Sequence, residues 1–145
     1  MTVPELIAPG VYRVDAIGLQ NMISVLLLKN DDGWTLVDTG TENSVGRIRE
    51  AIAALGSGPG DLKRIFLTHQ HDDHTGGLPG LLAWGPNAEV GAPPHEAEVI
   101  SGRREKDPFA NPVIRRLARK AAIPAAKSVS RQISVVVGWT ECQVE

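Results

Sequence analysis

Hydrophobic residues in the first forty positions fall into short runs separated by turn residues. Residues 11–14 and 34–37 are short apolar stretches, and residues 23–28 form a longer continuous one. The Asn-Asp-Asp-Gly sequence at 30–33, between the last two runs, has the composition of a tight turn. We therefore expect three strands, of which the last two form a hairpin.

The hydrophobic period changes after residue 40. Four aliphatic residues recur at helical spacing and define one face of a helix. They are Val45, Ile48, Ile52 and Leu55. Glycines and a proline at 56–60 end this helix, and residues 64–67 form another buried-strand candidate. An apolar helix over 77–84, a weak strand at 89–91 and a short helix at 94–100 complete the order βββαβαβα.

The last part of the chain has fewer signals. We expect a helix over residues 111–122, stopped by Pro124, and a strand-like run at 133–137. A length of 145 residues suits a single domain. The alternation of strands and helices indicates an α/β (α+β) layer fold.

Composition narrows the class of protein. Hydrophobic residues make up 42% and charged residues 22%, as in ordinary folded domains. The net charge of -2 gives no global field that would attract nucleic acid or an anionic membrane. The N-terminus has no basic leader and no apolar run is long enough to cross a bilayer, so we expect a cytoplasmic protein with no membrane partner. A single cysteine, Cys142, excludes an internal disulfide.

Seven of the fifteen basic residues lie between Arg103 and Lys120. They are candidates for attracting an anionic substrate or an RNA backbone. Only one aromatic residue, Phe109, is interleaved with them, whereas single-stranded nucleic acid is usually stacked on several. A solvated surface is therefore the favoured interpretation, with no clear nucleic-acid partner.

Three of the four histidines lie within six consecutive residues, together with two aspartates. They are His69, His71, His74, Asp72 and Asp73. Imidazole and carboxylate groups are the ligands that zinc and similar metals prefer. His69 and His71, at alternate positions, are candidates for one ion, and Asp73 with His74 for a second. The alternative is a solvated turn whose aspartates cap the next helix.

The spacing His69-x-His71-x-Asp73-His74, followed by two glycines, resembles the motif of the metallo-β-lactamase superfamily. The resemblance extends to Leu-Val-Asp-Thr-Gly at 36–40 and covers residues 9–102 in order and character. It implies the first half of an αβ/βα sandwich, apparently truncated, in a partial domain at 1–126. The segment 127–145 has no clear relation to the family. We expect Gly76 and Gly77 to let the backbone turn sharply with little steric conflict.

The resemblance also implies a role for each site residue. His69 and His71 are then ligands of the first metal, and Asp73 and His74 are ligands of the second. Asp73 is the catalytic residue that orients the attacking water, and Asp38 is a buried group that holds the loop from behind. A simple turn-forming role is the alternative for Asp38. The implied cofactor is zinc, as one or two ions, with iron or manganese as other candidates.

The implied activity is metal-dependent hydrolysis of a small-molecule ester, thioester or lactone-type substrate. The resemblance implies further histidine and aspartate ligands downstream, but only His95 and Asp107 follow His74. We therefore expect a weakly active or inactive form of such a hydrolase. The alternative is a non-catalytic metal-binding or interaction domain.

Half of a two-sheet sandwich would leave one sheet face uncovered. We expect apolar strand residues to lose burial on that side, which would favour self-association. The residues concerned are Val25, Leu27, Ile65 and Leu67.

Overall fold

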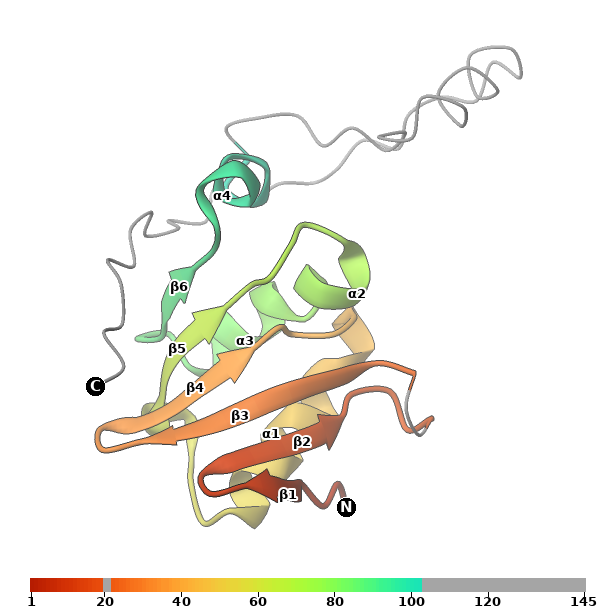
Figure 1. The fold of residues 1–145 in the computed structure, drawn as a ribbon, viewed down its shortest axis with the longest axis vertical. Helices are drawn as coiled ribbons and strands as arrows, with labels where there is room; N and C mark the ends of the chain where they lie inside the picture. The colour runs from red at the N-terminus through yellow and green to blue at the C-terminus, as the bar shows by residue number, and fades with distance from the viewer. Residues whose placement is uncertain (20–21, 103–145) are drawn as a thin grey trace.

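The computed structural model describes residues 1–19 and 22–102. A six-stranded sheet forms its centre, with the strands side by side in chain order (Figure 1). Strands β1 to β4 are antiparallel neighbours, and β4, β5 and β6 run parallel. The strands are β1 (Glu5–Ala8), β2 (Val11–Asp15), β3 (Ser24–Asn30), β4 (Gly33–Val37), β5 (Leu62–Phe66) and β6 (Glu89–Gly91).

Helices connect the parallel strands. Helix α1 (Val45–Ala54) joins β4 to β5, α2 (Asp72–Thr75) and α3 (Leu78–Trp84) join β5 to β6, and α4 (Pro94–Ile100) follows β6. Short 3-10 turns at Glu42–Ser44 and Pro59–Asp61 flank α1. This arrangement confirms the mixed α/β class and the hairpin between β3 and β4. The elements expected at 111–122 and 133–137, the basic cluster, Asp107 and Cys142 lie outside the described residues.

In the ranges that the structure describes, none of the helices has the length and apolar character needed to cross a lipid bilayer.

The sequence analysis missed β1. All four of its residues are exposed, so the strand shows no alternation of buried and exposed positions that would reveal it. It pairs with β2 across a tight turn at Gly10, where φ is 72°. An edge strand with both faces exposed to solvent is stabilised by its backbone hydrogen bonds to the neighbouring strand rather than by side-chain burial.

One face of the sheet packs on α1 and α3, which lie behind it in Figure 1. A row of five side chains crosses this face at paired positions of neighbouring strands. These are Tyr12, Leu27, Leu36, Ile65 and Val90. Ile48 and Ile52 from α1, with Leu78 and Leu81 from α3, complete the core. The helical periodicity and the strand alternation in the sequence thus meet in one apolar layer.

The expected loss of burial is wrong for the residues that were named. Val25, Leu27, Ile65 and Leu67 are each no more than 1% exposed. They belong to the core cluster that α1 and α3 cover, so the helices bury them. The residues at alternate strand positions occupy the opposite face and are partly exposed. These are Leu26, Leu28, Val37 and Phe66.

An ion pair ties the β3–β4 turn to β5. The Arg64 guanidinium donates a hydrogen bond from Nη1 to Asp32 Oδ1 at 3.0 Å. This hydrogen bond lowers the pKa of the Asp32 carboxyl and raises the pKa of Arg64. Asp32 is exposed, so the pair contributes little to stability.

Substitution of two adjacent leucines on β3 tests whether the two faces of the sheet are buried to different extents. Leu27→Ala leaves a cavity in the helix-covered core and should lower the free energy of unfolding by about 2–5 kcal/mol. Leu28→Ala removes the same atoms from the partly exposed face and should cost about 1 kcal/mol. Urea denaturation followed by tryptophan fluorescence gives both values. Equal losses for the two variants would mean that the faces are not buried differently.

Candidate metal centre

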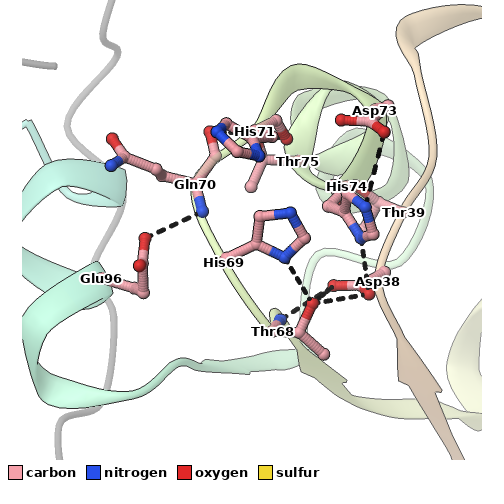
Figure 2. Close-up of polar contacts among 10 residues, drawn as sticks. All are labelled: Asp38, Thr39, Thr68, His69, Gln70, His71, Asp73, His74, Thr75 and Glu96. Atoms are coloured by element: carbon pink, nitrogen blue, oxygen red, sulfur yellow. Dashed lines mark hydrogen bonds and ion pairs between the residues drawn. The ribbon is translucent and has the colours of Figure 1, made fainter. Parts of the chain in front are cut away.

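The candidate site lies where two parallel strands end. Because β4 and β5 are parallel neighbours, their carboxyl ends meet at one edge of the sheet, which is where open α/β sheets bind ligands. Asp38 directly follows β4, and its backbone N–H donates to Phe66 O at 2.8 Å. Thr68 follows β5 by two residues and begins the histidine loop. The strand ladder therefore brings Asp38 next to a segment thirty residues away (Figure 2).

Hydrogen bonds attach α2 and the glycines that follow it to the Asp-Thr-Gly segment at 38–40. The backbone N–H and the hydroxyl of Thr39 both donate to His74 O, at 2.7 and 2.8 Å. The N–H of Gly77 donates to Gly40 O at 3.2 Å. These contacts fix the short helix that carries Asp73 and His74 over the end of β4.

The two glycines allow close packing of the backbone around them. Gly76 and Gly77 have φ values of -62° and -78°, which any L-residue adopts. A left-handed backbone is therefore not the reason for glycine at these positions, and the expected relief of steric conflict is. A Cβ at Gly77 would lie 2.3 Å from Thr39 O, and one at Gly76 would lie 2.5 Å from Asp72 O. A side chain at Gly77 would thus clash with the backbone after β4, and one at Gly76 with the carbonyl of the first residue of α2.

Asp38 is the group around which the loop is arranged. It is 8% exposed, and in the described part of the chain it is the one non-glycine residue with positive φ, at 61°. Its Oδ1 accepts the Thr68 N–H at 2.8 Å. Its Oδ2 accepts the Thr68 hydroxyl at 2.8 Å and faces His74 Nδ1 at 2.8 Å. A left-handed aspartate costs about 1–3 kcal/mol and persists where its surroundings require it, as these contacts do.

These contacts define the neutral tautomers of two histidines. An ionised carboxylate cannot donate, so the single Thr68 hydroxyl proton goes to Asp38. The Thr68 oxygen, 2.9 Å from His69 Nδ1, must then accept a proton from that ring. His74 Nδ1 likewise donates to Asp38 directly. In a neutral ring of this tautomer Nε2 carries no proton and is the nitrogen that can bind a metal.

The remaining candidate ligands lie beside these two rings. The ring centroids of His69 and His71 are 4.8 Å apart, and those of His69 and His74 are 3.8 Å apart. His74 Nε2 lies 3.5 Å from Asp73 Oδ2. His71 is the N-cap of α2, and its carbonyl accepts the backbone N–H groups of His74 and Thr75. The structure thus brings His69, His71, Asp73 and His74 into one cluster.

Within residues 1–19 and 22–102, no three His, Cys, Asp or Glu side chains are already spaced to hold a metal ion. The imidazole rings contact one another instead, and Asp73 faces His74. The chemistry of the donor set nevertheless fits a divalent ion such as zinc. Three imidazoles and a carboxylate are borderline-soft ligands, and two of the rings already have Nδ1 committed to hydrogen bonds.

A hollow of about 650 Å³ opens beside the cluster. Two of the four candidate ligands, His71 and Asp73, contribute to its wall. Its full lining is Thr41, Glu42, His71, Asp72, Asp73 and Gly76. Three of these six residues carry carboxyl groups.

Two polar residues of the site had no assigned role in the sequence analysis. Thr68 connects Asp38 to His69, and only the geometry of the strand end reveals it. Glu96 on α4 accepts the backbone N–H of Gln70 at 2.9 Å, a contact between residues that no local pattern links. His95, the fourth histidine, is a surface residue whose side chain is 76% exposed.

Comparison with known proteins finds metallo-β-lactamases and other hydrolases among those similar to this chain. A solved variant of a metallo-β-lactamase from Cronobacter sakazakii is 38% identical, with a TM-score of 0.62, over 74% of this chain and 40% of that one. A hydroxyacylglutathione hydrolase from Aeromonas salmonicida is 33% identical over 72 residues, which are 50% of this chain and 26% of the relative. A ribonuclease Z from Pseudomonas putida is 44% identical over 54 residues, 37% of this chain and 15% of the relative.

The chain therefore spans at most 40% of the length of these three proteins. The sequence model of the Metallo-beta-lactamase superfamily matches residues 19–135, which include both the Asp-Thr-Gly segment and the histidine loop. By this match and by its fold, the chain belongs to the metallo-β-lactamase superfamily.

Proposed function

We propose that the cluster holds one or two zinc ions and serves the hydrolysis of a small-molecule ester, thioester or lactone-type substrate. His69 and His71 would hold the first ion, and Asp73 and His74 the second, with iron or manganese as alternative metals. The observation that carries the proposal is the hydrogen bonding of Asp38 and Thr68, which engages Nδ1 of His69 and His74 and makes Nε2 the nitrogen that can bind metal. Nε2 of His74 lies 3.5 Å from Asp73 Oδ2, the other proposed ligand of the same ion. A solvated turn would have no need of this buried support.

Bound zinc supplies Lewis-acid activation of water and of the substrate's electrophilic group. The protein contributes positioning. Asp38 and Thr68 hold the imidazoles of two histidines in one tautomer. Gly76 and Gly77 allow the backbone after α2 to pack closely against the end of β4. Asp73 lies in the exposed first turn of α2 and borders the hollow, where its carboxylate can orient a water molecule.

The hollow favours a small substrate over RNA. Its volume of about 650 Å³ falls in the range of pockets that bind small molecules. The carboxyl groups of Glu42, Asp72 and Asp73 repel a polyanionic backbone, and the described lining contains no lysine or arginine. The similar hydroxyacylglutathione hydrolase is named for a small-molecule substrate, whereas ribonuclease Z makes RNA the competing candidate.

Zinc binding is the first test of this proposal. Replacing His69 and His71 together with Ala should abolish zinc binding measured by calorimetry, because both proposed ligands of the first ion are lost. Asp31→Ala removes an exposed carboxylate in the β3–β4 turn, at the other end of β4 from Asp38, and should leave zinc affinity unchanged. Circular dichroism confirms that each variant folds. If the double variant binds zinc like the wild type, the metal site lies elsewhere.

Turnover is the second test. The described residues offer two histidines to the first ion, whereas catalytic zinc sites normally have three protein ligands. The metal-loaded chain should therefore hydrolyse thioesters, esters or lactones about 100-fold or more below a complete relative, and a metal chelator should remove that activity. Activity on an RNA substrate alone would contradict the small-molecule assignment. Stoichiometric zinc without turnover on any substrate would select a non-catalytic metal-binding domain.

A further inference from the structure

Glu96 holds the histidine loop from the side opposite Asp38. Its carboxylate Oε2 accepts the backbone N–H of Gln70 at 2.9 Å, across 26 residues of sequence (Figure 2). The Glu96 side chain is only 15% exposed, although it lies on the first turn of the short helix α4. A carboxylate that is this little exposed to water requires a hydrogen-bond donor, and the backbone N–H of Gln70 provides one.

The sequence around Glu96 explains why it is available for this contact. Glu96 is the third residue of α4, a position from which glutamate commonly reaches back to the N-cap backbone N–H. Here the N-cap is Pro93, and the next residue is Pro94, so neither has an N–H to donate. The Glu96 carboxylate therefore lacks the N-cap N–H donor that usually binds a glutamate at this position.

The peptide that Glu96 holds lies between two candidate ligands. Gln70 separates His69 from His71, and the orientation of its peptide group helps to set how the two rings face each other. Asp38 binds the N–H of Thr68, one residue before His69, and Glu96 binds the N–H one residue after it. Two carboxylates from different elements therefore fix the backbone on both sides of His69.

We propose that Glu96 is a positioning residue that holds the loop in the conformation in which His69 and His71 bind the same metal ion. The proposal rests on the proposed metal binding by these histidines. Glu96 acts through the Gln70 peptide, not as a ligand. Its loss should therefore change the metal's affinity and coordination geometry without removing a donor atom.

Cobalt(II) provides the test, because its visible absorption reports coordination geometry directly. Cobalt affinity and spectrum are measured for the wild type, Glu96→Ala, Glu96→Gln and Glu98→Ala. Glu96→Ala removes the acceptor and should weaken cobalt binding about 10- to 100-fold with an altered spectrum. Glu96→Gln keeps an uncharged acceptor and should lose about 5-fold. Glu98→Ala, an exposed position on the same helix, should match the wild type.

The outcomes separate this inference from the proposed function. A wild-type chain that binds no cobalt overturns the metal site itself and the role of Glu96 with it. A wild type that binds cobalt, with Glu96→Ala unchanged in affinity and spectrum, overturns the role of Glu96 alone. If Glu96→Ala fails to fold, Glu96→Gln decides: wild-type affinity and spectrum in that variant contradict the proposal, and a 5-fold loss with an altered spectrum supports it.

Discussion

The candidate site depends on one buried carboxylate. Asp38 accepts the backbone N–H and the hydroxyl of Thr68 together with a ring proton of His74. Through the Thr68 hydroxyl it also determines the proton position on His69. A single group thereby orients two imidazoles that come from different parts of the loop. Its left-handed backbone, rare outside glycine, indicates that this arrangement is maintained against a local energetic cost.

The sheet topology places that carboxylate beside the histidine loop. Strands β4 and β5 must be parallel neighbours so that Asp38 and Thr68 emerge at the same edge of the sheet. The buried layer of α1 and α3 against the sheet holds those strands in register. Gly76 and Gly77 then let α2 contact the strand end closely enough for the Thr39 hydrogen bonds to form. Core packing far from the cluster is thus connected to the orientation of the histidines.

The sequence predicted most of this architecture because its signals are local. Helical spacing identified α1, and the Asn-Asp-Asp-Gly turn identified the β3–β4 hairpin. The clustering of histidines and aspartates identified the candidate ligands. Strand β1 escaped notice because an edge strand with exposed side chains carries no periodicity. The Thr68 relay and the Glu96 contact escaped because they join residues by tertiary geometry. The expected relief of steric conflict at Gly76 and Gly77 is confirmed, but the backbone atoms that approach them are visible only in the structure.

The most direct test of the central role of Asp38 is the tautomeric state of the histidines in the metal-free protein. Two-bond proton–nitrogen NMR spectra at a pH of about 8, above the ordinary imidazole range, distinguish Nδ1–H from Nε2–H rings. The geometry predicts that His69 and His74 are Nδ1–H tautomers, and that Asp38→Asn loses this preference. Predominantly Nε2–H rings at both positions in the wild type would contradict the account.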